Sequence, residues 1–297
     1  MSMYSADADI DRLIAEDLGF GDLTTRALGL DMAPARITFS ARTPLVACCT
    51  EEAARILTRL GATVTGPVMP SGQFAPPGTL LLAAEGPGHA VLGGWKIAQT
   101  LIEWAAGLAT ATRELVTAAQ AITPDIAIAC TRKTVPFTRA LSAKAVLAGG
   151  GVMHRLGLSE TILVFPEHRA LLPVGVSATD ALRKLRRAVP ERALVIEVKS
   201  VDDALAVASI ADVVQLEKFS PVDVRKVVAG AAKRHDGRPV IAAAGGIGPA
   251  NVADYAATGA DVLVTSFPYT ARPAEVQVRI GPSPAPGGFE PTRGTQT

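Results

Sequence analysis

The chain has few cysteines and almost no net charge, and each shortage excludes a class of protein. Its 297 residues carry 29 Lys and Arg against 28 Asp and Glu, so no long-range field draws it to nucleic acid or to an acidic membrane surface. Three cysteines, two of them adjacent at Cys48 and Cys49, give neither a disulfide framework nor the spacing of a metal site. We expect them to be small buried side chains in a reducing compartment.

Long apolar runs and a leader-like start are also missing. The most apolar stretch, 91–111, contains Lys96 and Glu103, and therefore predicts an amphipathic helix rather than a membrane span. Residues 1–11 are acidic and lack the basic and apolar regions of a secretory signal. We therefore expect a cytoplasmic protein with no membrane and no nucleic-acid partner. The hydrophobic content of 48% suffices for a sizeable core, in two domains or in one large barrel.

From about residue 123 onward, short β-branched runs alternate with capped helices, a pattern typical of a parallel α/β sheet or barrel. Ser177, Ser200 and Ser220 each precede an aspartate by three residues, which places a capping hydroxyl and a favourable negative charge in the first helical turn. We predict a six-stranded parallel α/β barrel. Its expected strands are 126–130, 161–165, 194–198, 213–217, 240–244 and 262–266.

The first hundred residues have a different organisation. Helical patterns at 10–18 and 51–60 accompany strand-like pieces at 36–40 and 79–84, separated by Pro and Gly turns. This mixture predicts a small N-terminal α/β sandwich, followed by a long helix over 91–121. The expected parts are therefore a sandwich domain with its covering helix at 1–112, a barrel domain at 113–271, and a return segment and flexible tail at 272–297, loose from Gly281 onward.

Cationic side chains gather in two runs within the otherwise apolar second half. Thr131, Arg132 and Lys133 follow the first barrel strand, and a triple glycine leads to His154 and Arg155. Positive groups held together beside a hydrophobic sheet repel one another and lose hydration, so a bound phosphate or carboxylate would balance them. The alternative is that they pair with the chain's own carboxylates on a solvated surface. The combination of both runs favours an anion site.

Two glutamates occupy inward positions on neighbouring barrel strands. Because side chains alternate along a strand, Glu197 and Glu217 both face the barrel interior, near the carboxyl ends where α/β barrels place their active sites. Two inward carboxylates require a cation, a hydroxyl-bearing ligand, or both. The alternative is that they pair with Lys199 and Lys218, or with the cationic runs.

Glycines and hydroxyls follow the last two barrel strands. Gly245 and Gly246 lie between the fifth strand and a predicted helix, and Thr265 and Ser266 end the sixth. Loops in this position, with free backbone amides, commonly bind phosphate.

Together these motifs resemble the quinolinate phosphoribosyltransferase family. The resemblance rests on Glu-Asp-Leu-Gly-Phe-Gly-Asp-Leu-Thr-Thr at 16–25, on Thr-Arg-Lys-Thr at 131–134, on Gly-Gly-Gly-x-x-His-Arg at 149–155 and on Gly-Gly-Ile at 245–247, and it covers nearly the whole chain. Gly-Trp-Lys at 94–96 and Val-Thr-Ser-Phe-Pro-Tyr at 264–269 are more similar to the ModD-type branch of that family, described as molybdenum-utilisation proteins or pyrophosphorylases.

The resemblance implies a pentosyltransferase that uses phosphoribosyl pyrophosphate, a small aromatic acid and Mg²⁺. It implies a homodimer in which the sandwich domain of one subunit covers the barrel mouth of the other and Lys96 reaches into the partner's site. The implied catalytic residues are Lys133, Glu197 and Glu217, with both glutamates also holding the metal. The implied substrate-binding residues are Lys96, Thr131, Arg132, Lys133, His154, Arg155, Phe165, His168, Gly245, Gly246, Thr265 and Ser266.

The chain departs from the family pattern where the acid substrate would bind. Phe-Pro-Glu-His at 165–168 stands in place of the family's Lys-Asp-Asn-His, and Lys96 in place of an arginine. A charge-assisted hydrogen bond contributes about 1.5–3 kcal/mol, so losing that lysine weakens a dicarboxylate about tenfold or more. We therefore expect an acceptor with less negative charge and a larger apolar face against Phe165.

Two alternatives stay open at this point. One is a quinolinate phosphoribosyltransferase proper, acting in NAD biosynthesis, in which Arg139 or Lys144 replaces the lost cation. The other is a non-catalytic binder of a phosphorylated metabolite or oxyanion, although such a binder would gain nothing from Glu197 and Glu217 beside its ligand.

Overall fold

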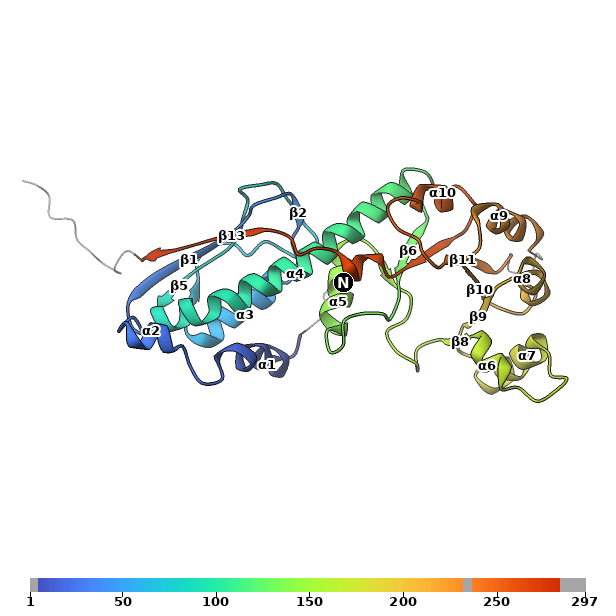
Figure 1. Ribbon diagram of the computed structural model, residues 1–297, viewed down its shortest axis with the longest axis horizontal. Coiled ribbons are helices and arrows are strands. Elements are labelled where there is room, and N and C mark those ends of the chain that lie inside the picture. Colours follow the sequence, from blue (N-terminus) through green and yellow to red (C-terminus); the bar gives the residue numbers. More distant parts are fainter. Residues whose placement is uncertain (1–4, 232–236, 284–297) are drawn as a thin grey trace, which may run out of the picture. The chain divides into compact units, whose positions relative to one another are not determined.

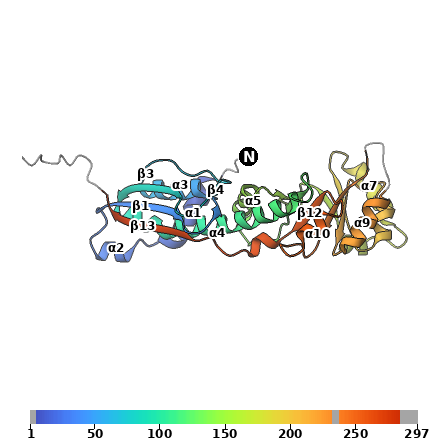
Figure 2. The same cartoon turned by 90° about the horizontal axis from the view of Figure 1, so that it is seen from above.

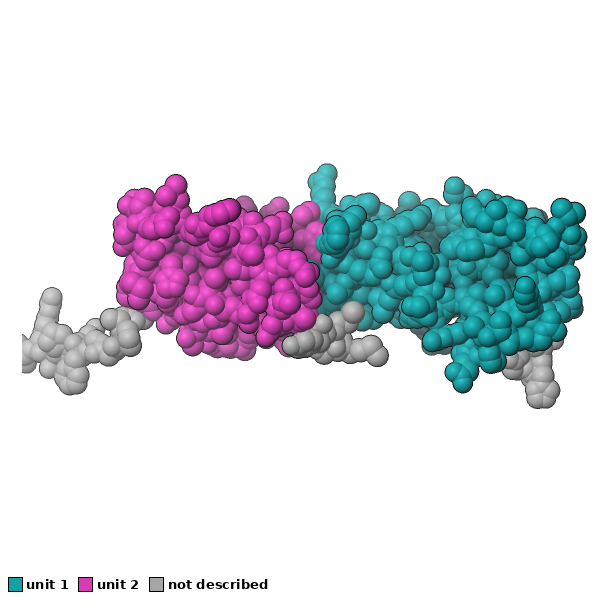
Figure 3. Space-filling model, turned by 90° about the horizontal axis from the view of Figure 1, so that it is seen from below, with its two compact units in different colours: residues 1, 107–272 teal, residues 2–106, 273–297 magenta. Residues whose placement is uncertain are grey.

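The computed structural model describes residues 5–231 and 237–283, and Figures 1 and 2 show its ribbon from two directions. The chain divides into two compact units, which Figure 3 colours separately. One unit holds residues 107–272, and the other holds residues 2–106 together with 273–297. The division falls inside one helix, α4 (Gly88–Gln120), six residues before the boundary predicted at 112.

The N-terminal unit contains an antiparallel sheet with the strand order β13-β1-β5-β3, and a separate pair of strands, β2 and β4. Along β1 buried and more exposed residues alternate, and Ile37 and Phe39 enter the core completely. The elements of this unit are α1 (Asp7–Leu18), α2 (Leu23–Ala27), β1 (Pro34–Ala41), β2 (Leu45–Val46), α3 (Thr50–Leu60), β3 (Thr63–Val64), β4 (Phe74–Ala75), β5 (Leu80–Pro87), the first part of α4, and β13 (Val276–Pro282).

The last strand corrects one expectation from composition. Gly281 and Pro282 belong to β13, where they pair with Arg36 and Ala35 of β1, so the predicted tail does not start at Gly281. The edge of β1 offers backbone hydrogen-bond partners, and these outweigh the weak strand propensity of Gly and Pro. Residues 284–297, the rest of the predicted tail, lie outside the described residues.

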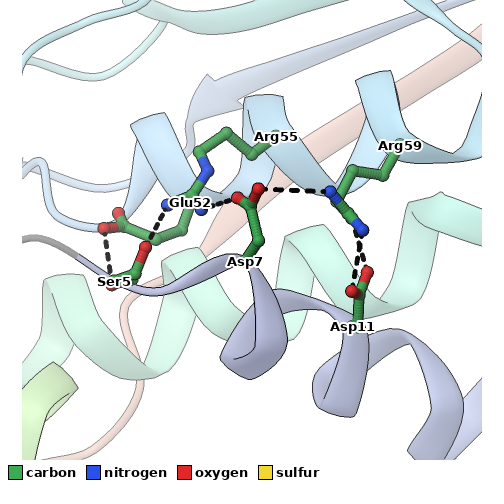
Figure 4. Close-up of polar contacts among 6 residues, drawn as sticks. All are labelled: Ser5, Asp7, Asp11, Glu52, Arg55 and Arg59. Carbon is green, nitrogen blue, oxygen red and sulfur yellow. Dashed lines mark hydrogen bonds and ion pairs between the residues drawn. The ribbon is translucent and has the colours of Figure 1, made fainter.

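Charged side chains join α1 to α3 in this unit (Figure 4). Arg55 forms an ion pair with Asp7 at 2.5 Å, and Arg59 makes a two-pronged contact with Asp11, with Nη2 donating to Oδ2 at 2.7 Å. Ser5 donates from its hydroxyl to Glu52 at 3.0 Å. Every arginine drawn here therefore has a carboxylate of the same unit as its partner.

The second unit is built on a parallel sheet with the order β7-β6-β12-β11-β10-β9-β8. All six predicted strands are present, each within one residue of the predicted ends. The seventh strand, β7, is only two residues long and was not predicted. The sheet is a curled half-barrel with β7 and β8 at its edges, and its strands are β6 (Ala127–Cys130), β7 (Val152–Met153), β8 (Ile162–Val164), β9 (Leu194–Val198), β10 (Val213–Glu217), β11 (Val240–Ala244) and β12 (Val262–Thr265).

Helices pack against this sheet through an aliphatic core that includes Leu182, Ile196 and Leu216. The three predicted caps are confirmed, since Ser177, Ser200 and Ser220 each accept a hydrogen bond from the backbone N–H three residues later at 3.1–3.2 Å. The helices are the end of α4, α5 (Arg139–Ala148), α6 (Pro166–Ala170), α7 (Ala178–Ala188), α8 (Val201–Val207), α9 (Pro221–Gly230), α10 (Val252–Ala256) and the 3₁₀ turn η1 (Phe267–Thr270).

Within residues 5–231 and 237–283, the structure contains no helix with both the length and the apolar character needed to cross a membrane. The 33-residue α4 fails this requirement, because charged residues interrupt its apolar sequence.

Candidate active site

A cavity of about 480 Å³ opens at the carboxyl ends of β6, β9, β10, β11 and β12. All the predicted site residues except Lys96 and His168 line it. Those that the structure brings together are Thr131, Arg132, Lys133, His154, Arg155, Phe165, Glu197, Glu217, Gly245, Gly246, Thr265 and Ser266. These residues come from loops and strands spread over 136 positions, from Thr131 to Ser266, and the parallel sheet collects them at one edge.

The cations of this cavity have no carboxylate partner in the described part of the chain. Among the described residues there is no ion pair for Arg132, Lys133 or Arg155, although Arg155 as a whole residue is only 5% exposed. Burial, followed by the nearby charge of Arg132, lowers the pKa of Arg155. Burial also lowers the pKa of His154, with further lowering by Arg155 and Arg132. The alternative in which these cations pair with Glu197 and Glu217 is therefore not what the structure shows, and an arriving anion would relieve the repulsion.

The two glutamates face the same cavity from neighbouring strands. Glu197 is 9% exposed, and burial and then the charge of Glu217 raise its pKa above the ordinary value. Gln215, opposite Glu197 in the strand register, donates from Nε2 to Glu197 Oε2 at 2.7 Å and favours its ionised form. Neither glutamate forms an ion pair among the described residues, although the charge of Lys199 partly offsets the rise in the pKa of Glu197.

The two carboxylates fit a magnesium ion. Mg²⁺ prefers oxygen ligands, and it commonly takes one or two carboxylates and completes its shell with water and substrate phosphates. Among the described residues no group of three or more metal-binding side chains lies together, so Glu197 and Glu217 would leave most of the coordination shell to water and substrate.

The glycine loop after β11 needs its glycines. Gly245 has φ +94° and Gly246 φ +75°, a left-handed conformation that side chains rarely adopt. A Cβ atom on Gly245 would lie 2.6 Å from Lys218 Cγ and 2.9 Å from Lys218 N. Thr265 ties this loop to β12, because its hydroxyl donates to the Ile247 carbonyl at 2.6 Å. The loop is thus held close to the cavity with its backbone uncovered.

Comparison with known proteins identifies this arrangement. The family model for the quinolinate phosphoribosyl transferase C-terminal domain matches residues 108–278, and the model for the N-terminal domain matches residues 22–106. The chain belongs to the quinolinate phosphoribosyltransferase family. It is accordingly a phosphoribosyltransferase, and the family resemblance predicted from the motifs is confirmed.

Curated relatives agree with this membership. A protein of Rhodobacter capsulatus named "Putative pyrophosphorylase ModD" is 49% identical over 81% of this chain and 92% of the relative. One of the same name from Pasteurella multocida is 36% identical over 94% of this chain and 98% of the relative. A probable nicotinate-nucleotide pyrophosphorylase (carboxylating) of Archaeoglobus fulgidus is 30% identical over 74% of this chain and 84% of the relative. The predicted similarity of this chain to the ModD-type branch is therefore confirmed.

Solved structures show the same fold. The crystal structure of NadC from Streptococcus pyogenes superposes with a TM-score of 0.87, at 23% identity, over 96% of this chain and 99% of that one. The nicotinate-nucleotide pyrophosphorylase of Francisella tularensis gives a TM-score of 0.83 at 21% identity, over 95% and 99% of the two chains.

In this phosphoribosyltransferase, Phe165 separates the cavity from a neighbouring one. The Arg155 guanidinium lies 5.6 Å from the centre of the Phe165 ring, and the His168 ring stacks behind Phe165 at 5.8 Å. His168 Nδ1 accepts a hydrogen bond from the Phe165 backbone N–H at 3.0 Å. His168 therefore supports Phe165 and does not line the predicted site itself.

Three residues in or beside the cavity were missed by sequence reasoning. Gln215 and Glu167 line the cavity, and Tyr269 donates from its hydroxyl to the Thr131 carbonyl at 2.7 Å, which fixes the loop that carries Arg132. Gln215 could have been found, because it has the same alternation as Glu217 two residues later. No sequence signal places Tyr269 beside Thr131, since that contact depends on the pairing of β6 with β12.

Lys96 lies on α4 in the N-terminal unit and is not among the cavity-lining residues. Its Nζ donates to Gln99 Oε1 at 3.0 Å and lies 4.4 Å from the centre of the Trp95 ring. The side chain has no carboxylate partner among the described residues, so its charge is available to an anion.

Proposed function

We propose that this phosphoribosyltransferase transfers phosphoribose from phosphoribosyl pyrophosphate to a heteroaromatic acceptor that carries a single carboxylate, with release of pyrophosphate. The observation that carries the proposal is a set of charges in one cavity that form no ion pair with the described residues. They are cationic at Arg132, Lys133 and Arg155 and anionic at Glu197 and Glu217. A substrate with phosphates at one end and sugar hydroxyls at the other balances both signs.

The chemistry needs no nucleophilic side chain. Displacement of pyrophosphate develops positive charge on the ribose and negative charge on the leaving group, so catalysis consists of positioning and charge stabilisation. Lys133 would bind leaving-group oxygens, and the backbone amides of Gly245 and Gly246 would bind the 5-phosphate. The glutamates would hold the ribose hydroxyls and stabilise the positive sugar.

Magnesium is the cofactor that suits this donor set. Glu197 and Glu217 would hold it, and when bound it would supply positive charge to the leaving pyrophosphate. Its arrival would also favour the ionised form of Glu197, whose pKa burial and Glu217 raise. Gln215 already prepares that form by donating to the carboxylate.

The acceptor is inferred from the charges that remain near Phe165. Neither Arg139 nor Lys144 lines the cavity, so neither candidate replaces the family's lysine in the described part of the chain. Arg132 and Arg155 can serve one carboxylate, while a second would face the Phe165 ring without a partner and cost several kcal/mol, roughly. This supports a mono-acid over quinolinate, and it separates the proposed activity from that of the carboxylating relatives.

Pyrophosphate release tests the proposal directly. The purified protein is mixed with phosphoribosyl pyrophosphate, Mg²⁺ and either quinolinate or a mono-acid such as nicotinate. We expect the mono-acid to give the larger kcat/KM. Efficient turnover of quinolinate would favour the enzyme of NAD biosynthesis instead, and binding without release from any acceptor would favour a non-catalytic binder.

We further propose a homodimer in which Lys96 enters the partner's cavity. Its support is the family membership and the unneutralised charge of Lys96. Two inactive variants, Lys96→Ala and Glu197→Gln, should regain activity when they are unfolded and refolded together, because some mixed dimers then carry one intact site. No recovery from the mixture, in a protein shown to be dimeric, would place Lys96 outside the site.

A cellular role in molybdenum utilisation, in the cytoplasm, is proposed from the similarity to the ModD-type branch. All three cysteines are free and buried, as suits a reducing compartment. Deleting the gene should slow growth at limiting molybdate and leave growth with ample molybdate unchanged. Equal growth of both strains at limiting molybdate would argue against this role.

A further inference from the structure

A second cavity, of about 750 Å³, adjoins the active-site cavity. The two share Arg132, Arg155, Leu163 and Phe165 as lining residues, so they are neighbours across the Phe165 ring. The far wall of the second cavity comes from α7 and from the segment before it, with Ala181, Leu185 and Val176 among its residues. We call it the apolar chamber.

The apolar chamber offers little to a polar ligand. Its walls are mostly aliphatic, and its polar side chains away from the shared arginines are those of Thr161, His168, Asp180 and Lys184. Asp180 accepts from the Ser177 hydroxyl at 2.7 Å and lies 3.3 Å from Arg183, and Lys184 is exposed. His168 Nδ1 is occupied by the Phe165 backbone N–H. An apolar occupant would therefore gain from burial while covering few polar groups.

The charges at the junction define the other end of the occupant. Arg132 and Arg155 border both cavities, repel each other and have no ion pair in the described residues. A molecule that enters the chamber from the active site passes these guanidinium groups first. Its anionic group would stay with them, and its apolar part would continue past Phe165.

We propose that the apolar chamber is an acceptor subsite, which takes a fused ring or an alkyl substituent of a heteroaromatic monocarboxylate. The carboxylate meets Arg132 and Arg155 at the junction, and the ring nitrogen to be ribosylated stays in the polar cavity. This inference rests on the proposed function and makes its substrate class narrower. Each methylene buried in the chamber should strengthen binding about fourfold.

Kinetics with a graded series of acceptors test the subsite. The series starts from nicotinate and adds an alkyl chain or a fused benzo ring, with phosphoribosyl pyrophosphate and Mg²⁺ held saturating. We expect KM to fall by about fourfold per added methylene until the chamber is filled, with kcat changing little. A KM that is flat or rises along every arm of the series would overturn the subsite.

Filling the chamber provides the matching variant. Ala181→Phe on α7 should raise the KM of the extended acceptors at least tenfold and leave nicotinate unchanged, because it lies beyond Phe165. Ala188→Phe, an exposed lining position, repeats the test with less risk to folding. Ala253→Phe on α10 is exposed and lines neither cavity, so it serves as the control. Equal kinetics of the lining and control variants would contradict the subsite.

A binding measurement separates failure of the subsite from failure of the enzyme. Anilinonaphthalene sulfonate carries one anionic group on an apolar ring system, and its fluorescence should rise on the wild type, fall with Ala181→Phe and persist with Ala253→Phe. If no acceptor releases pyrophosphate, the proposed function fails, whatever the probe does. If nicotinate is turned over but the probe binds both variants equally, only the subsite fails. A change of oligomeric state on Ala181→Phe would instead identify a second copy of the chain as the occupant, and would also overturn the subsite.

Discussion

Charged side chains cluster in both units of the molecule, but their partners differ. In the N-terminal unit Arg55 and Arg59 reach Asp7 and Asp11, so each charge is neutralised within the unit (Figure 4). In the other unit Arg132 and Arg155 share a cavity with carboxylates and yet form no ion pair in the described part of the chain. The first cluster fastens two helices, whereas the second keeps its charges free at a cost in stability, which is typical of a binding site.

The largest expected effect comes from removing a charge of the unpaired cluster. Glu197→Gln should lower kcat/KM for phosphoribosyl pyrophosphate by about 10²–10³-fold, because it removes a group that stabilises developing charge. The free energy of unfolding should stay the same or rise, since burial and Glu217 both disfavour the ionised Glu197. Pyrophosphate release and urea denaturation measure the two quantities. A loss of stability as large as the loss of activity would make Glu197 a structural residue.

Removing an arginine of the cavity should also weaken activity without lowering stability. Arg155→Met keeps an apolar stem and removes the charge, so we expect the KM of the acceptor to rise about 10–150-fold, the worth of one charge-assisted hydrogen bond. The melting temperature should rise, because Arg155 is buried beside Arg132 and no carboxylate of the described residues pairs with it. An unchanged KM would remove Arg155 from the acceptor site.

The pH dependence of stability gives a further test of the charges in the cavity. Burial and the neighbouring arginines place the folded-state pKa of His154 below its ordinary value of 6.5, so the folded protein binds this proton less readily than the unfolded chain. The stability tied to neutral His154 is complete above pH 6.5 and is lost as the pH falls through that value toward the folded-state pKa.

A variant isolates this contribution. Between pH 7 and pH 5, the wild type should lose stability more steeply than His154→Gln, by at most about 1.4 kcal/mol per pH unit. Chemical denaturation at a series of pH values gives both slopes. Parallel curves for the two proteins would show that His154 titrates as it does in the unfolded chain.

The smallest effect belongs to the paired cluster. Arg59→Met should lower the free energy of unfolding by only about 0.2–1 kcal/mol, the range for exposed ion pairs, and should leave both KM values unchanged. It is the matched control for Arg155→Met, because it should lower stability whereas Arg155→Met should raise it. A rise in KM for either substrate would break the division between the two clusters.

Much of the barrel fold could be predicted because it depends on local signals. Short β-branched runs and serine caps mark six strands and three helix starts, and alternation along a strand orients Glu197 and Glu217 correctly. The missed elements depend on distant partners. β7 is two residues long and exists through its pairing with β6, and β13 includes Gly and Pro because β1 supplies its hydrogen bonds.

The unit boundary and parts of the candidate site could not be predicted from the sequence for similar reasons. The division between the units falls within α4, where the helical pattern continues without interruption. Phe165 was expected to face the acceptor, and the structure shows that it also borders the apolar chamber, which depends on the packing of α7 near β8. Gln215 lies on the same face of β10 as Glu217, but a glutamine at such a position does not by itself indicate a site. Only its contact with Glu197 in the folded protein identifies it.

The most direct test of the unpaired cluster is pyrophosphate release from phosphoribosyl pyrophosphate in the presence of Mg²⁺ and nicotinate, compared among the wild type, Glu197→Gln and Arg59→Met. The free charges of the cavity predict release by the wild type and by Arg59→Met, and almost none by Glu197→Gln. Equal release by all three proteins, or no release by the wild type with any heteroaromatic acid, would contradict a catalytic role for this cavity.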